Sequence, residues 1–180
     1  MLNIPGLTIA VRDAGDGPQG MMLAASSELD YDYRDLDVQR STIGNFLARV
    51  EAWQVPALRA AFTDPAARGF YFDSVSQTHM PSWINGSVAV IGDAGHCAAL
   101  LSGMGTTLAM VAAETLANTW TECDGNLQRA SKTYHERLRP YVEQCQAFAQ
   151  EGAPIMVPLT QEALDRRNAT FRDIAARFAK

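Results

Sequence analysis

The sequence predicts an α+β fold in which extended segments come first and helices follow. Residues 7–33 contain two extended stretches that a polar break separates. A third apolar run, residues 87–91, is bounded by glycines, as is typical of a strand buried on both faces. From Gly105 onward, apolar residues recur at helical spacing. We therefore expect strands in the first half of the chain and helices in the second.

The first two extended stretches predict a β-hairpin with a long polar turn. Residues 7–11 are apolar, residues 13–18 carry turn-forming residues, and a second stretch covers residues 21–33. Residues 15–20 fit the pattern G-x-G-x-x-G letter for letter, but neither a βαβ unit nor an amphipathic helix accompanies them. We interpret them as the hairpin turn and not as a nucleotide-binding loop.

Between this hairpin and the third strand, the sequence predicts two helices and a short strand. The expected elements are a helix capped by Asp37 and running to about Trp53, a short helix between Pro56 and Pro65, and a strand at Phe70–Phe72.

Three further helices are expected after Gly105. They are a helix capped by Thr106 or Thr107, a helix over 126–151 that Pro140 should kink or break, and a helix from Thr160 to Lys180 after a linker marked by Pro154 and Pro158. The strand at 87–91 presents a difficulty, because a single strand of this type is not stable without neighbours. It needs partner strands that the sequence does not obviously contain.

Composition narrows the class of protein. The chain has 180 residues, a formal net charge of -5 and no cluster of basic residues, which argues against a nucleic-acid or membrane partner. No apolar run is long enough to span a bilayer. Cys97, Cys123 and Cys145 are odd in number and widely spaced, as expected for reduced thiols in a cytoplasmic protein, and no metal-ligand spacing is present.

The stretch that carries chemistry runs from Gly86 to His96 and continues from Ser102 to Ala109. It reads as a buried strand, a Gly92-Asp93 turn, a glycine-rich loop and the start of a helix. A carboxylate directly after a strand is well placed to accept hydrogen bonds from a polyol. The free N–H groups of a helix that begins near Gly105 favour an anionic ring or a phosphate.

This stretch resembles the second flavin motif of the class A FAD-dependent aromatic monooxygenases, relatives of para-hydroxybenzoate hydroxylase. Their pattern is roughly G-R-V-x-L-x-G-D-A-A-H, followed by a short loop and G-x-G. The version here most resembles the subgroup of tetracycline-inactivating monooxygenases and actinobacterial polyketide hydroxylases. Residues 71–77 and 134–142 add further matches. The resemblance covers most of the chain and implies the carboxy-terminal part of such an enzyme.

The resemblance implies FAD as cofactor, NAD(P)H as co-substrate and an aromatic or polyketide-like small-molecule substrate. The cofactor-binding residues that it implies are Gly92, Asp93, Gly103, Met104, Gly105, Thr106 and Thr107, with Asp93 on the ribityl chain. Four residues could line the substrate pocket or could be ordinary core: Phe70, Phe72, Met80 and Trp83. Residues 1–83 would be the end of a substrate-domain β-sheet. Residues 84–180 would be the last strand and carboxy-terminal helices of an FAD-binding α/β domain.

Some features depart from the family. Ser87 replaces an arginine, Leu100 replaces a proline, and Thr107 replaces an asparagine. The amino-terminal G-x-G-x-x-G motif and the internal Asp-Gly motif are not recognisable, so FAD binding should be weak or absent in the isolated chain. We therefore expect a second polypeptide or a homodimer.

Two alternatives remain open at the level of sequence. The chain could be a flavin-free remnant that acts as a cofactor-independent cyclase or isomerase, or that binds a ligand. The sequence identifies no catalytic residue. The candidates are His96 as a base, Cys97 as a redox thiol, and a triad of Ser102, His96 and Asp93. For each of them the sequence favours a structural role.

Overall fold

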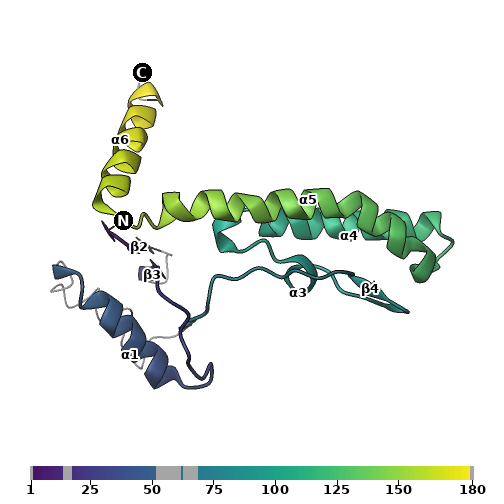
Figure 1. Cartoon of the computed structure of the whole chain (residues 1–180), viewed down its shortest axis with the longest axis horizontal. Helices are drawn as coiled ribbons and strands as arrows, with labels where there is room; N and C mark the ends of the chain where they lie inside the picture. The colour runs from purple at the N-terminus through teal and green to yellow at the C-terminus, as the bar shows by residue number, and fades with distance from the viewer. Residues whose placement is uncertain (1, 14–17, 52–61, 63–68, 179–180) are drawn as a thin grey trace. The chain divides into compact units, whose positions relative to one another are not determined.

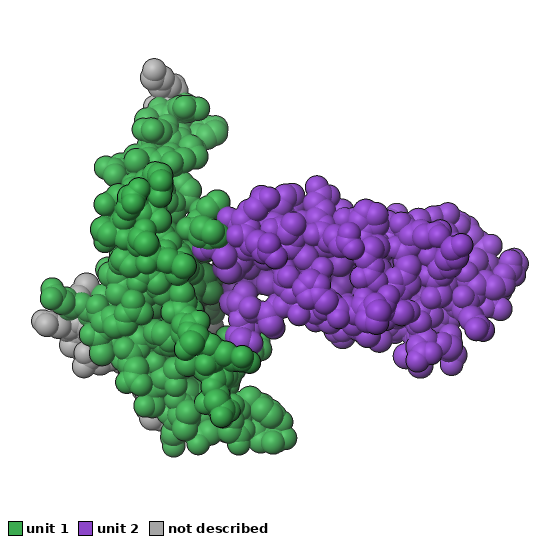
Figure 2. Space-filling view, viewed as in Figure 1, with its two compact units in different colours: residues 1–73, 154–180 green, residues 74–153 purple. Residues whose placement is uncertain are grey.

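The computed structural model describes residues 2–13, 18–51, 62 and 69–178. Helices and small antiparallel sheets make up the chain, which confirms the predicted mixture of α and β structure (Figure 1). The chain forms two compact units (Figure 2). Unit 1 comprises Met1–Asp73 with Pro154–Lys180, and unit 2 comprises Ser74–Ala153.

Unit 1 contains an antiparallel sheet of three strands in the order β1-β2-β3. The strands are β1 (Leu2–Ile4), β2 (Leu7–Asp13) and β3 (Pro18–Ala24). β2 and β3 pair from Leu7 opposite Ala24 to Asp13 opposite Pro18, which confirms the predicted hairpin. The turn at 14–17 lies outside the described residues. The second strand ends at Ala24, well short of the predicted extent to residue 33.

Helix α1 (Leu36–Leu47) begins earlier than predicted and also ends earlier. Asp35, and not Asp37, is its cap, because the Asp35 carboxylate accepts hydrogen bonds from the N–H groups of Asp37 (3.1 Å) and Val38 (3.0 Å). The predicted helix between Pro56 and Pro65 lies outside the described residues except for Phe62.

The core of unit 1 forms between the sheet and α1. Its buried members are Leu7, Ile9, Ile43, Leu47, Val50 and Phe62. Phe70 and Phe72 pack at its edge as irregular chain, so the strand predicted at Phe70–Phe72 is wrong. Side-chain packing of these aromatic residues explains their apolar pattern without a sheet partner.

Helix α6 (Gln161–Phe178) packs against the rest of unit 1 through its first half, where Leu164 and Arg167 are buried. The Thr160 hydroxyl accepts a hydrogen bond from the N–H of Ala163 (3.2 Å), which confirms the predicted start. Arg167 donates to the carbonyl of Ile155 (3.1 Å) and to Oδ1 of Asn3 (3.1 Å), and so ties the helix to β1.

Unit 2 begins with a two-stranded hairpin followed by helices. Its elements are β4 (Ile84–Asn85), β5 (Val88–Ala89), α3 (Asp93–His96), the 3₁₀ helix η2 (Leu100–Ser102), α4 (Gly105–Glu122) and α5 (Leu127–Met156). The strand predicted at 87–91 is therefore only two residues long. Val88 is 62% exposed and Ile91 is 45% exposed, so the prediction of burial on both faces is wrong for the chain by itself. Among the described residues, β5 pairs with β4 and no strand pairs with its other edge.

Helices α4 and α5 lie side by side and enclose the core of unit 2 (Figure 1). The core contains Trp83, Leu108, Ala112, Tyr134, Leu138, Val142 and Cys145. The N-cap of α4 is Met104, and it makes no side-chain capping bond, so the predicted cap at Thr106 or Thr107 is wrong. Both threonines lie inside the helix.

Helix α5 continues through Pro140, so of the predicted kink or break the break is wrong, and Pro154 lies in its last turns instead of in a linker. Burial of Leu138 and Val142 on either side of Pro140 offsets the hydrogen bond that a proline removes.

Candidate functional site

The Gly92-Asp93 turn has a backbone conformation that requires glycine. Gly92 has φ 66° and ψ -150°, and its carbonyl accepts hydrogen bonds from the N–H groups of Gly95 and His96 (both 3.0 Å). Asp93 is exposed, and within the described part of the chain no hydrogen bond to its carboxylate is found. Its backbone carbonyl accepts a hydrogen bond from the hydroxyl of Thr78 (2.9 Å). The backbone is therefore fixed while the carboxylate remains free to accept a ligand hydroxyl.

Trp83 supports this turn from the core. Its indole Nε1 donates to the carbonyl of Gly95 (2.9 Å), and a Cβ atom at Gly95 would lie 2.9 Å from the carbonyl oxygen of Val90. Trp83 is 1% exposed and stacks on His135, with ring centroids 4.5 Å apart and planes at 6°. Trp83 is therefore a core residue that stabilises the loop through its hydrogen bond to Gly95.

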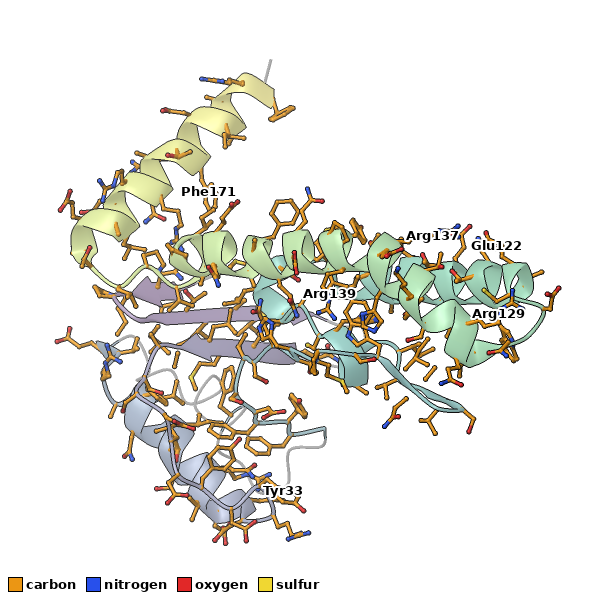
Figure 3. The ribbon with its side chains drawn as sticks, turned by 45° about the vertical axis from the view of Figure 1, so that its right-hand side comes forward. Tyr33, Glu122, Arg129, Arg137, Arg139 and Phe171 are labelled. Carbon is orange, nitrogen blue, oxygen red and sulfur yellow. The ribbon has the colours of Figure 1, made fainter. Side chains whose placement is uncertain are left out.

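His135 and Arg139 on α5 complete the support. His135 Nε2 accepts a hydrogen bond from the backbone N–H of Trp83 (2.8 Å), so this nitrogen is unprotonated. The guanidinium of Arg139 (labelled in Figure 3) lies 4.1 Å from the Trp83 ring centroid and donates to the carbonyls of Met80 (3.0 Å) and Pro81 (3.1 Å). Burial, and then the charge of Arg139, lower the pKa of His135.

His96 lies beneath the turn and is 1% exposed. Burial lowers its pKa, although its own backbone carbonyl and Asp93 act in the opposite direction. Its Nε2 has no hydrogen-bond partner among the described residues. A neutral, buried imidazole is not placed to take a proton from a ligand outside the core.

The glycine-rich loop leaves the first turn of α4 open. Gly103 adopts φ 65° and ψ 5°, and α4 begins at Gly105 without a side-chain cap. Thr106 and Thr107 are exposed, and among the described residues no acceptor is found for the N–H groups of Gly105, Thr106 and Thr107. The Ser102 hydroxyl donates to the carbonyl of Ala99 (2.8 Å) and accepts from the N–H of Met104 (3.1 Å), which occupies it structurally.

The residues predicted to contact substrate are divided between the two units. Phe70 and Phe72 belong to unit 1, where Arg40 lies over the Phe70 ring (4.6 Å) and Tyr31 packs edge-on against Phe72 (5.0 Å). Met80 and Trp83 belong to unit 2 and pack in or against its core. A common substrate wall made of these four residues stays a prediction.

The sequence analysis did not predict the polar side chains that hydrogen-bond to the backbone around the loop. Gln77, Gln146, His135 and Arg139 each bond to backbone atoms near the motif. One signal was present: Gln146 falls among the buried positions of α5, where a polar side chain requires a partner.

The described residues contain no group of His, Cys, Asp or Glu that could hold a metal ion. Nor does any helix within these residues have the length and apolar character needed to cross a membrane. All three cysteines are free.

No family model matches the sequence. The chain is 32% identical over 160 residues to a flavin-dependent monooxygenase from an unknown prokaryotic organism, covering 87% of this chain and 40% of that protein. It is 34% identical over 149 residues to an uncharacterized protein of Mycobacterium tuberculosis, covering 82% of this chain and 39% of that protein. Its structure matches the crystal structure of tetracycline destructase Tet(51) with a TM-score of 0.71 and 29% identity, covering 96% of this chain and 46% of that chain.

The chain resembles flavin-dependent monooxygenases in sequence and a tetracycline destructase, a class A flavoprotein hydroxylase, in structure, and the partial coverage fits a carboxy-terminal part. It spans less than half the length of these relatives.

Proposed function

We propose that the chain is the carboxy-terminal portion of an FAD-dependent monooxygenase that hydroxylates an aromatic or polyketide-like small molecule in the cytoplasm. An amino-terminal half on another polypeptide would supply the nucleotide-binding part. NAD(P)H would be the co-substrate, and antibiotic biosynthesis is the setting that the resemblance favours. Residues 1–83 would correspond to the substrate-binding sheet and residues 84–180 to the FAD-binding domain.

Two observations in unit 2 carry this proposal: the uncapped first turn of α4 and the exposed carboxylate of Asp93. The Asp93 carboxylate would accept a hydrogen bond from a ribityl hydroxyl. The N–H groups at Gly105, Thr106 and Thr107 would donate to the pyrimidine edge of the ring. Gly92 and Gly103 have positive φ values, and their lack of a side chain allows a planar group to approach the backbone closely. The residues present therefore fit the ring and ribityl parts of a flavin.

When bound, FAD would supply the redox chemistry that activates oxygen, and the protein would supply orientation and exclusion of water. The helix dipole of α4 would stabilise negative charge at its first turn. Trp83, through its bond to Gly95, would keep the turn in place.

A second polypeptide is favoured by the apolar surface of unit 2. Val88, Ile91, Met110 and Trp120 are between 45% and 63% exposed. A shallow groove of about 680 Å³ lies beside β5, with Ala89, Leu116, Trp120 and Leu127 among its lining residues. Exposed apolar side chains of this kind would suit an interface with a second chain. The edge of β5 that no described strand pairs with would suit a neighbouring strand from an amino-terminal half.

The test is the absorbance of the purified chain between 350 and 500 nm, alone and after mixing with the amino-terminal half of a related monooxygenase and FAD. We expect flavin to remain after desalting only in the mixture, followed by substrate-dependent oxidation of NAD(P)H. The motifs that would contact the pyrophosphate and ribose are not recognisable in the sequence, and affinity would depend on these contacts. Yellow chain recovered without any partner contradicts the need for a second half. Binding of a polycyclic phenol without flavin, unaffected by Asp93→Ala, favours the flavin-free cyclase, isomerase or binding protein.

A further inference from the structure

Two glutamine side chains bind the backbone that leads into the glycine-rich loop. Gln146 on α5 donates from Nε2 to the carbonyl oxygens of Thr78 (2.9 Å) and Cys97 (3.2 Å). Gln77 donates from Nε2 to the carbonyl oxygens of Ala98 (3.2 Å) and Gln146 (2.7 Å). Because Gln146 is only 7% exposed, water does not readily replace a bond that its amide loses.

Further along α5, Gly152 approaches the same loop without a side chain. A Cβ atom at this position would overlap the carbonyl oxygen of Leu101, and a backbone atom cannot rotate away as a flexible side chain can. Helix α5 therefore contacts the loop twice: Gln146 holds its beginning at Cys97, and Gly152 allows close packing at Leu101.

Between these two contacts, Ala99 adopts a backbone conformation that residues with side chains rarely occupy, with φ 69° and ψ 153°. Such a conformation persists only where the surroundings fix it. Its N–H donates to the sulfur of Cys97 (3.4 Å), and its carbonyl accepts from the N–H (3.1 Å) and hydroxyl (2.8 Å) of Ser102. The same hydroxyl accepts from the N–H of Met104, the N-cap of α4. A continuous set of bonds thus links α5 to the first turn of α4.

We propose that Gln146 and Gly152 are positioning residues that hold this first turn in the geometry that the flavin ring needs. The identity of the ligand rests on the proposed function, whereas the restraint on the loop is a property of the chain alone. Neither residue is assigned a contact with the cofactor. Both act through the backbone of residues 97–104. Their loss should loosen this segment and leave the core between α4 and α5 intact.

The first experiment measures hydrogen exchange by mass spectrometry on the full chain without flavin. Gln146→Leu removes both amide donors at similar size, and Gly152→Ala adds the overlapping Cβ. Gln150→Leu changes an exposed glutamine of the same helix, and Gly44→Ala adds a Cβ in open space on α1. We expect residues 97–105 to exchange about tenfold faster in the first two variants, with residues 134–145 and both controls unchanged.

Gln146→Glu separates positioning from simple packing. A glutamate has nearly the same shape but donates a hydrogen bond only when it is protonated. Relative to wild type at each pH, the faster exchange of residues 97–105 should be large at pH 8 and smaller at pH 5. If residue 146 only fills space, the ratio of the exchange rate in Gln146→Glu to that in wild type should be the same at both pH values.

The second experiment titrates FAD into each variant mixed with the amino-terminal half. Faster loop exchange together with about tenfold weaker FAD binding supports the proposal. Faster loop exchange with no FAD binding even in the wild type leaves the loop restraint in place and refutes the flavin function. Unchanged loop exchange in both variants, or an equal increase in residues 134–145, overturns the proposal. If Gln146→Leu does not fold, Gly152→Ala and Gln146→Glu decide by the same criteria.

Discussion

Asp93 projects its carboxylate from a turn in which the carbonyls of Gly92 and Asp93 both accept hydrogen bonds. In the assembled enzyme, a hydrogen bond from a ribityl hydroxyl to this charged acceptor would be worth about 1.5–3 kcal/mol. Asp93→Ala should therefore weaken FAD binding by roughly one to two orders of magnitude. Fluorescence titration with FAD of the chain paired with its amino-terminal half measures this.

Two variants control for the Asp93 prediction. Asp93→Asn retains an acceptor and should lose less affinity than Asp93→Ala. Glu114→Ala removes an exposed carboxylate from the middle of α4 and should have no effect. All three should melt close to wild type, because these side chains lie outside the core. Equal FAD affinity in wild type and Asp93→Ala would remove the flavin role from this turn.

His135 should make stability depend on pH. Its unprotonated Nε2 accepts the Trp83 N–H, and its pKa is lowered by burial and by Arg139. A histidine with a lowered folded pKa stabilises the fold above its unfolded pKa of about 6.5, and this contribution is lost as pH falls through the folded pKa. We expect the free energy of unfolding in urea to decrease below about pH 6.5.

His96 also has a lowered pKa, so the two histidines must be separated. His135→Asn keeps a hydrogen-bond acceptor without a titrating ring, and it should reduce the decrease at low pH while His96 maintains the remainder. An unchanged pH profile in His135→Asn would show that the contact between His135 and Trp83 does not contribute.

At the scale of elements, the cap of α1 tests how the helix begins. Asp35 accepts two backbone N–H groups, whereas Asp37 lies within the first turn. Asp35→Ala should destabilise unit 1 by about 1 kcal/mol. Asp37→Ala removes the same charge without the cap and should cost clearly less. Urea denaturation followed by circular dichroism compares them, and equal losses would contradict the cap assignment.

Elements whose signal is local were predictable from the sequence. Hairpin β2–β3 and the start of α6 at Thr160 follow from turn residues and a capping hydroxyl, and both are confirmed. The sequence did not decide between Asp35 and Asp37 as the cap of α1, because both carboxylates lie near the first apolar residue of the helix. Pro140 shows where a local rule fails. The rule predicts a kink or break at a proline inside a helix, but α5 continues through Pro140 because it is buried against α4.

The candidate site was only partly predictable for the same reason. The Gly92-Asp93 turn and the helix that begins near Gly105 are contiguous in sequence and follow from residue types. Gln77, Gln146 and Arg139 lie far from the motif along the chain, and only the tertiary packing brings them to it. Phe70 and Phe72 illustrate the converse, since an aromatic run that reads as a strand is irregular chain packed at the edge of a core.

For the whole molecule, the exposed apolar surface of unit 2 predicts association. Val88 in β5, Ile91 shortly after it, and Met110 and Trp120 on α4 are all substantially exposed. We expect the purified chain at micromolar concentration to sediment as a stable dimer or as a complex with a second polypeptide. Val88→Lys should weaken this association, while Glu143→Lys at an exposed position of α5 should not. A well-behaved monomer in analytical ultracentrifugation would contradict the prediction.

Gly95 has a consequence for consensus design. The family pattern that this motif resembles has alanine where the chain has Gly95, and substitution toward a consensus residue commonly stabilises a protein. Here the added methyl would lie 2.9 Å from the carbonyl oxygen of Val90 and 3.4 Å from Cδ1 of Trp83. Restoring the common residue should therefore lower the melting temperature, unless the Val90 backbone moves with it. A library built from family frequencies should keep residues 90 and 95 as a coupled pair, because the tolerated residue at one depends on the backbone position of the other.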